Sequence, residues 1–386
     1  MARLVQFVDS AADEKAEPGA PATLRWSNVF ALFGLFVVAF LVAAFAVRSV
    51  LPAYLETSHI RQNYRHYERY ASRYDTVFLG SSRVQFQVDP ATFDRVMKER
   101  GLESCSFNFG IAALNGFGVE FVLDQILALS DGSLQRVIVD LGDMRWKLKE
   151  GHAKTEQVIV RHDTANTWRY LQLIERVEKK QSKHFQSAER HLQAWLNHMT
   201  SVGKGSQWLK GWVFRTPPPV RPPSEYDRFE PLDRRLTGER SPRNVASTRA
   251  HERFLSDPEK FERQVSRLGR AVEKFDDKRK DKELTDAQRG LVERVVAAIR
   301  DAGAEPYVFV APRGDLKGAF VLLAQDEGLV EHVLNYTDPE RFESFYEVAN
   351  HFDGAHLNER GAILFTERVA RDIAEIESGE KKAPEE

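Results

Sequence analysis

Two short stretches of this sequence carry the residue types of a nucleophilic catalyst. Ser81 and Ser82 follow an apolar run and a glycine, and Asp353 and His356 lie three residues apart near the C-terminus. A serine hydroxyl is a poor nucleophile at neutral pH unless an imidazole takes its proton, and a carboxylate often holds that imidazole in place. Together the two stretches predict the transfer or hydrolysis of an acyl group.

Each stretch also has a plain structural interpretation. A serine that follows a strand is a favoured helix cap, and an Asp-x-x-His spacing arises often by chance. His351, Asp353 and His356 are also possible metal ligands. Because no further ligand lies near them in the sequence, we predict no metal and no cofactor.

A third stretch, Asn108–Gly116, reads NFGIAALNG and is rich in small residues. Small residues let a loop approach a ligand closely, and its backbone N–H groups could stabilise an oxyanion. A simple turn explains the same composition equally well.

These stretches need a scaffold that brings them together. Short apolar runs alternate with helical patterns, which predicts an α/β fold: a doubly wound, mostly parallel sheet with helices on both faces. Ligands bind beyond the carboxyl ends of such strands. The expected strands are Thr76–Leu79, Ser104–Phe109, Val137–Leu141 and Pro306–Pro312; helices are expected at Pro90–Lys98 and Val119–Leu129, after a capping box at Thr285, and from Asn358 onward.

The order of these stretches resembles the SGNH/GDSL hydrolase superfamily, over about residues 75–145 and 285–375. Gly80-Ser81-Ser82 stands where the family has Gly-Asp-Ser, and the residues around Asp353 and His356 resemble its last block. The resemblance implies a flavodoxin-like sheet of the SGNH hydrolase type. It also implies that Ser82 is the nucleophile, His356 the base and Asp353 its partner, and that Ser81 replaces the family's aspartate.

The oxyanion-binding residues follow from the resemblance less directly. The family's second block places its N–H donor at Ala113, with Gly110 as the alternative. Met144 stands where the third block has the asparagine of the oxyanion hole, and the loss of such a donor costs about 10²–10³ in rate. Asn115 and Arg83 are candidates to compensate, and Arg83 is also a candidate substrate contact.

An apolar segment places the protein in a membrane. Residues 29–47 carry no charge over 19 residues, close to the about 20 that cross a bilayer as a helix. A cleaved signal peptide is the alternative, but its apolar core is usually shorter, about 7–15 residues. We therefore expect an anchor at residues 29–49, single-pass in the inner (cytoplasmic) membrane, with the C-terminal domain periplasmic or otherwise extracytoplasmic. The flanking charges are balanced and do not set this orientation.

The rest of the chain divides by composition. The charged, helix-forming insertion holds a Pro-rich stretch, residues 216–227, which we interpret as a spacer, and the insertion as a cap over the site. The expected segments are a disordered tail (1–28), the anchor, a helical stalk (50–74), the first part of the core (75–146), the insertion (147–284), the second part of the core (285–377) and a disordered tail (378–386).

Bulk composition excludes several function classes. The formal net charge is -2 and no basic or zinc-binding motif is present, so we expect no nucleic-acid partner. The single cysteine, Cys105, excludes an intrachain disulfide, and its apolar surroundings predict a small buried side chain.

Membrane-anchored members with Gly-Ser-Ser resemble bacterial envelope proteins that acylate or deacylate glycans. The resemblance implies a serine esterase or O-acyltransferase that acts on acyl esters of cell-envelope glycans, by hydrolysis or by transfer. It also implies a membrane-bound O-acyltransferase as a partner. The alternative is an inactive scaffold with the same fold, which binds an envelope polymer or an assembly partner. The Met144 substitution and the long insertion motivate this alternative.

Overall fold

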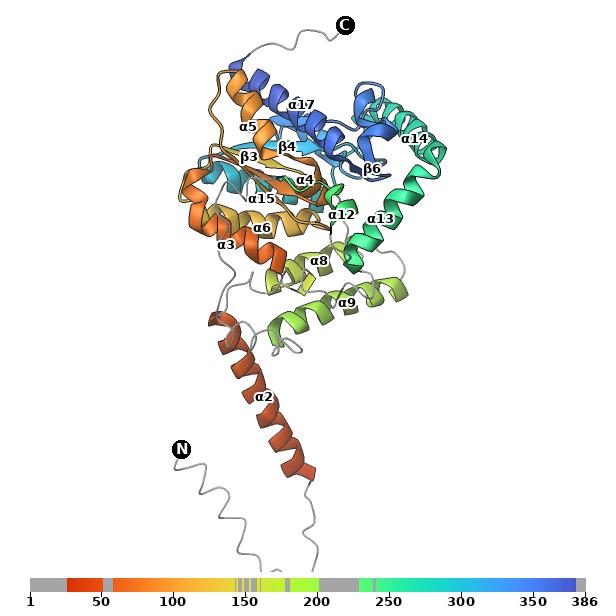
Figure 1. Cartoon of the computed structure of the whole chain (residues 1–386). Coiled ribbons are helices and arrows are strands. Elements are labelled where there is room, and N and C mark those ends of the chain that lie inside the picture. Colours follow the sequence, from red (N-terminus) through yellow and green to blue (C-terminus); the bar gives the residue numbers. More distant parts are fainter. Residues whose placement is uncertain are drawn as a thin grey trace, which may run out of the picture. The chain divides into compact units, whose positions relative to one another are not determined.

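The computed structural model describes most of the 386-residue chain (Figure 1). Residues 1–25 of the predicted N-terminal tail, the Pro-rich stretch and all but the first residues of the C-terminal tail lie outside the described residues. Residues 26–28, predicted as part of that tail, are instead helical. The chain divides into two compact units, which are described separately: Met1–Pro52 with Met199–Ser201, and Ala53–His198 with Val202–Glu386, called here the sheet unit. The described residues are 26–50, 58–142, 144, 148, 153, 158–159, 161–177, 181–200, 229–238 and 241–379.

The first unit contains one long apolar helix, α2 (Trp26–Val50). Its segment Trp26–Ala46 is long and apolar enough to cross a membrane, and none of it is buried inside the protein. The helix predicted at residues 29–49 is therefore present.

The sheet unit is built on five parallel strands in the order β2-β1-β3-β4-β5. This order is that of a doubly wound α/β sheet with a switch point between β1 and β3, so the predicted α/β class is confirmed. Gly80 pairs with Gly110 in the last register position of β1 and β2, so these two strands end at the same edge. The strands are β1 (Thr76–Gly80), β2 (Ser106–Gly110), β3 (Arg136–Val139), β4 (Glu305–Val310) and β5 (His332–Asn335).

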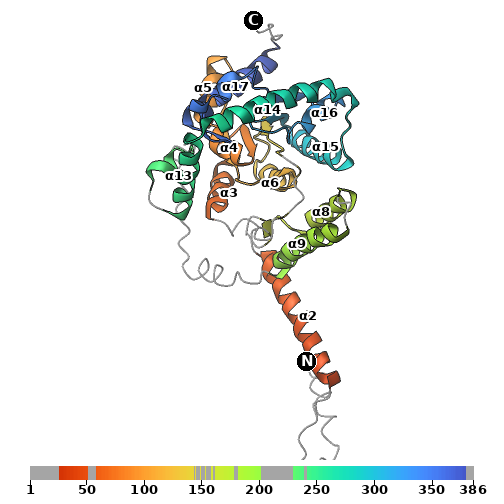
Figure 2. The same cartoon turned by 90° about the vertical axis from the view of Figure 1, so that its right-hand side faces the viewer.

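Helices cover both faces of the sheet because alternate strand residues point to opposite sides. Val77 and Leu79 join one core cluster, while Phe78 joins the other. Figures 1 and 2 show the two helical layers. The first cluster includes α3 (Ser58–Tyr70), α6 (Gly116–Leu129), α15 (Asp286–Asp301) and α16 (Phe320–Asp326), and the second includes α5 (Pro90–Glu99), α14 (Pro258–Asp277) and α17 (Glu359–Ser378).

Side-chain caps start several of these helices where the sequence predicts them. The capping box at Thr285 is formed in full with Gln288. Asn358 accepts a hydrogen bond from the N–H of Gly361 and caps α17. Each cap satisfies an N–H group that would otherwise lack a partner at the helix start.

The prediction of a stalk at residues 50–74 is wrong for its described part. α3 is helical as expected, but Tyr64 and Tyr67 are 2% and 0% exposed. Both rings pack edge-on against Phe109 of β2. Tyrosines three residues apart lie on one helix face, and that face is buried against the sheet rather than displayed to solvent.

The described parts of the insertion are mainly helical, as predicted. α8 (Thr164–Val177) docks beside the start of α6, where the Tyr170 ring packs on Phe117 with centroids 4.8 Å apart. α12 (Arg234–Thr237), α13 (Pro242–Leu255) and α14 continue the insertion toward the C-terminal half. α8 and α9 (Gln181–Thr200) lie side by side in both views (Figures 1 and 2).

The α8–α9 packing contains a buried histidine pair. His162 Nε2 lies 2.9 Å from His191 Nδ1. Burial, followed by the nearby charge of His191, lowers the pKa of His162 to about 3. An unfolded histidine has a pKa of about 6.5. The unfolded chain therefore binds more protons between pH 6.5 and 3, and this packing loses stability as the pH falls through that range.

We expect α8 and α9 to open at acidic pH. Hydrogen exchange in both helices, corrected for the intrinsic rate, should rise between pH 8 and pH 5, because one such group contributes up to about 1.4 kcal/mol per pH unit. α15 contains no histidine and is the internal control. If the protection of α8 and α9 relative to α15 were the same at pH 8 and at pH 5, this expectation would be contradicted.

Candidate active site

β1 delivers the serine pair to the carboxyl edge of the sheet. The strand ends at Gly80, Ser81 caps the next helix, and Ser82 is the first residue of α4 (Ser82–Gln87). A Cβ at Gly80 would lie 2.5 Å from Val84 Cγ2 and 2.9 Å from Asp140 Cβ. Only glycine allows this close return of the chain, so Gly80 sets where Ser82 lies.

The structure brings the three predicted catalytic residues together. The Ser82 Oγ is 2.9 Å from the His356 Nε2. The other ring nitrogen of His356, Nδ1, is 3.0 and 3.2 Å from the two carboxylate oxygens of Asp353. Nucleophile, base and orienting carboxylate thus lie within hydrogen-bonding reach in series, which is the geometry of a Ser-His-Asp triad.

A short antiparallel pair of strands, β6 (His351–Asp353) and β7 (His356–Leu357), holds the acid and the base. Asp353 Oδ1 accepts hydrogen bonds from the N–H groups of Ala355 and His356. Burial alone would raise the pKa of Asp353, but the hydrogen bonds and charge interaction with His356, with those N–H donors, hold it below its usual value. An ionised Asp353 favours a proton on Nδ1 of His356, which leaves Nε2 to accept the Ser82 proton.

Ser81 has a different role from Ser82. Its hydroxyl donates to Oδ2 of the buried Asp140 at 3.2 Å, and the N–H of Gly142 donates to Oδ1 at 2.9 Å. These bonds tie the turn after β1 to the turn after β3. Asp140 was not among the residues predicted for the site, although its place directly after an apolar strand predicts a position at this edge.

The backbone N–H groups of Ser82 and Ala113 donate to no partner among the described residues. Ala113 has φ 62°, in the left-handed region where glycine is usual. Ala113 therefore has a backbone conformation that glycine usually adopts. Ser82 and Ala113 are the two candidate oxyanion donors.

The other two predicted oxyanion contacts already form hydrogen bonds within the protein, and their contact with an oxyanion stays a prediction. The N–H of Gly110 donates to Asn108 Oδ1 at 2.8 Å. A Cβ at Gly110 would lie 2.2 Å from the backbone nitrogen of Gln85, so the glycine is needed for packing. The Asn115 side chain caps α6 through Gly118, and it also bonds the hydroxyl of Tyr170.

Met144 and Arg83 also occupy defined surroundings. Met144 is half-buried and packs on the first core cluster beside Gly116. Its thioether therefore offers no side-chain hydrogen-bond donor at this position. Arg83 is half-buried. Burial raises the pKa of Tyr346, and the positive charges of Arg313 and Arg83 partly oppose that rise. The contact of Arg83 with substrate stays a prediction.

Part of the insertion lies beside the triad. The Phe86 ring meets the His356 ring edge-on at 6.2 Å between centroids, and the Arg235 guanidinium lies 4.6 Å above the Phe86 ring. Leu232 and Phe352 complete a small cluster with Phe86. These residues could not be predicted from the sequence, because no local pattern indicates that a segment near residue 235 contacts one near residue 86.

The insertion also holds the loop that carries the base. His251 of α13 bonds the carbonyl of Phe352 through Nδ1 at 2.7 Å and stacks on its ring. Asp233 accepts a hydrogen bond from the N–H of Glu359, at the start of α17. Both contacts flank the segment that contains Asp353 and His356.

The alternative of a metal site at His351, Asp353 and His356 finds no support. Both ring nitrogens of His351 face backbone carbonyls, those of Asp353 and Phe345, at 3.1 and 2.7 Å. His356 is engaged with Ser82 and Asp353.

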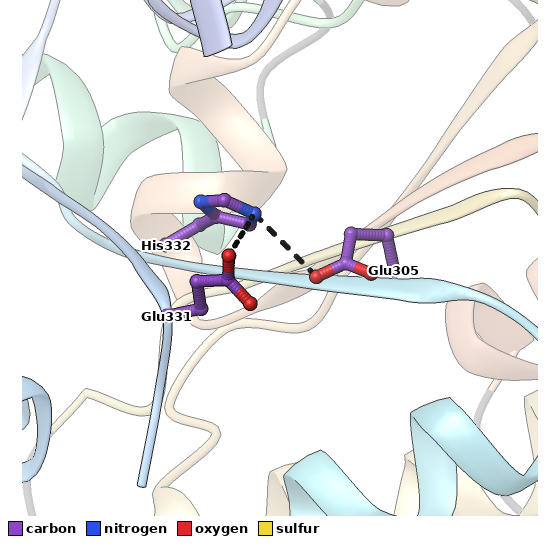
Figure 3. A group of neighbouring side chains, drawn as sticks. All are labelled: Glu305, Glu331 and His332. Carbon is purple, nitrogen blue, oxygen red and sulfur yellow. Dashed lines mark ion pairs between the residues drawn. The ribbon is translucent and has the colours of Figure 1, made fainter. Parts of the chain in front are cut away.

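A different acidic group lies at the opposite, amino-terminal edge of the sheet (Figure 3). His332 Nε2 is 3.6 Å from Glu305 and 3.9 Å from Glu331. Arg300 also pairs with Glu331. These contacts form a network of ion pairs across the starts of β4 and β5, away from the triad.

The geometry of the candidate site is the basis for the proposed function, because the comparisons with known proteins give no match. No protein-family model matches this chain, and no curated protein matches it.

The two serines should differ in their effect on stability. Ser81→Ala removes one of the two donors to buried Asp140 and should lower the free energy of unfolding by about 1–3 kcal/mol. Ser82→Ala removes a hydroxyl from a partly exposed site and should change it by less than about 1 kcal/mol. Urea unfolding measures both, and equal losses would contradict the assignment of Ser81 to the turn.

Ala113→Gly should relieve backbone strain without removing the N–H donor. Alanine in the left-handed region costs roughly 1–2 kcal/mol relative to its preferred conformations, while glycine loses more entropy on folding. We expect a rise of up to about 1 kcal/mol in the free energy of unfolding. A clear loss of stability in the same urea experiment would show that the alanine methyl packs usefully.

Proposed function

We propose that this protein is a serine esterase or O-acyltransferase. The observation that carries the proposal is the series of contacts from Ser82 Oγ to His356 Nε2, at 2.9 Å, and from His356 Nδ1 to Asp353, at 3.0 Å. The carboxyl-edge location of Ser82 supports it, because ligands of such sheets bind there.

In the proposed reaction, Ser82 Oγ attacks the carbonyl carbon of an acyl ester while His356 Nε2 takes the hydroxyl proton. Asp353 holds the Nδ1–H of the resulting imidazolium. The N–H groups of Ser82 and Ala113 bind the oxyanion. Collapse of the tetrahedral intermediate breaks the ester bond, and the leaving alcohol takes the proton from His356.

The second half-reaction releases the acyl group. Water or a sugar hydroxyl attacks the acyl–Ser82 ester, and His356 takes the proton of the attacking group. As the second tetrahedral intermediate collapses, the bond between the acyl carbon and Ser82 Oγ breaks, and His356 returns its proton to Ser82 Oγ. Water gives net hydrolysis, and a sugar hydroxyl gives net transfer, so the accessibility of each acceptor decides the product.

The resemblance to SGNH/GDSL hydrolases suggests the setting. We propose an acylated cell-envelope glycan as substrate, a membrane-bound O-acyltransferase as partner, and a sheet unit at the outer face of the inner membrane. The presence of one helix that can span a membrane supports the anchored form.

The triad should react with serine-directed reagents. A fluorescent phosphonate should label the full-length protein, and Ser82→Ala should abolish labelling. Ser266→Ala, at an exposed position on α14, is the matched control and should label normally. Asp353→Asn should reduce the rate on acetyl esters by about 10⁴, because the amide favours the wrong imidazole tautomer. Labelling that is equal in the wild type and Ser82→Ala would overturn the enzyme assignment.

A second candidate function is that of an inactive scaffold which binds an envelope polymer or an assembly partner. The observation that favours it is Met144, which packs into the core where the family has an oxyanion donor. A folded wild-type protein that neither labels nor turns over acetyl esters would favour the scaffold.

A further inference from the structure

The exposed large apolar side chains of the sheet unit are unevenly distributed. Outside α2, all those that the structure describes lie on α8, α9, α12 or α13, within the insertion. Single exposed apolar residues are common, but a group of them on one element marks an interaction surface. The four on α8 and α9 are Trp168 (61% exposed), Phe185 (75%), Leu192 (46%) and Leu196 (50%).

Three of these residues form a line along α9. Phe185, Leu192 and Leu196 are separated by seven and four residues, so they lie on one side of the helix. The opposite side is buried, through His191, Ala194 and His198. We call the exposed line the α9 stripe. The helix is thus already docked through its other face, and the stripe points outward.

The length of the segment between α2 and α3 bears on what covers the stripe. Only residues 51–57 join α2 to α3. Val50 and Ser58 are eight residues apart, and a fully extended chain of that length spans at most about 29 Å. If α2 spans a bilayer, this short segment ties the sheet unit to that membrane, so lipid is an apolar phase available to the insertion.

The composition of α9 fits an interfacial helix. It has Phe and Leu on one side, and Lys183 and Arg190 against one acidic residue, Glu189. Helices of this kind lie in the membrane plane with the apolar side about 5–10 Å into the headgroup boundary. Tryptophans such as Trp168 are enriched at the same depth.

We propose that the α9 stripe binds the lipid surface of the bilayer that α2 spans. The contact gives the sheet unit a second attachment and so a preferred orientation on the membrane. The inference depends on α2 as a membrane span and is independent of the triad chemistry.

The test uses the full-length protein in nanodiscs of phosphatidylcholine with a minor fraction of phosphatidylglycerol. Cys105→Ala removes the native thiol, and Leu192→Cys carries an environment-sensitive fluorophore. Gln193→Cys, one position further along α9, and Arg263→Cys, exposed on α14, are the matched controls. Nitroxide-bearing lipids and aqueous iodide are the two quenchers, and nanodiscs leave both membrane faces open to iodide.

We expect lipid-borne nitroxide to quench the probe at Leu192 at least about threefold more than the probe at Arg263, with the reverse order for iodide. The probe at Gln193, which is turned about 100° away, should lie between them. Equal quenching at all three sites would overturn the proposal. Protection of Leu192 from both quenchers would also overturn it, because it would show that protein covers the stripe. Leu196→Cys serves as a second site if Leu192→Cys does not fold.

Discussion

The hydrogen bond between Ser82 Oγ and His356 Nε2 is the contact on which the proposed chemistry depends, and it joins residues 274 positions apart. A general base must lie within hydrogen-bonding reach of the proton it takes, and small displacements reduce the rate strongly. Both segments must therefore be positioned by elements that do not move. The parallel sheet and the insertion supply this rigidity in different ways.

Ser82 is positioned by packing. Strand β1 is central and fully buried, Gly80 permits close approach to Val84 and Asp140, and the Ser81–Asp140 hydrogen bond ties the turn to β3. No flexible side chain intervenes between the sheet and the nucleophile. His356 lies outside the main sheet, on the short pair β6–β7, and needs support from other segments.

That support comes largely from the insertion. His251 bonds and stacks on Phe352, and α13 and α14 pack near the pair of strands that holds Asp353 and His356. On the other side, Arg235 and Leu232 reach Phe86, whose ring meets His356. The insertion is thus a structural part of the candidate site. Because it also carries the α9 stripe, it connects the acid–base residues to the surface that we propose binds lipid.

Much of the scaffold could be predicted because its signals are local. Apolar runs marked the strands, and caps at Thr285 and Asn358 marked helix starts. The hydrogen bonds of Gly110 and Asn115 within the protein could not be predicted, since their local sequence does not show which neighbouring groups they contact. α3 was wrongly predicted as part of a stalk for a related reason. The spacing of its tyrosines indicates one helix face, but it does not show that the sheet buries that face.

Local patterns in the sequence were sufficient to predict the helix that can span a membrane, the α/β class and the residue types of the candidate triad. These depend on apolar length, on alternation and on strand ends that meet at one sheet edge. Tertiary contacts were needed to show that Ser82 rather than Ser81 reaches His356, that Asp140 accepts the hydrogen bond of the Ser81 hydroxyl, and that the Ala113 N–H has no partner among the described residues. These outcomes depend on which polar groups meet across distant segments, and each donor proton can satisfy one acceptor at a time.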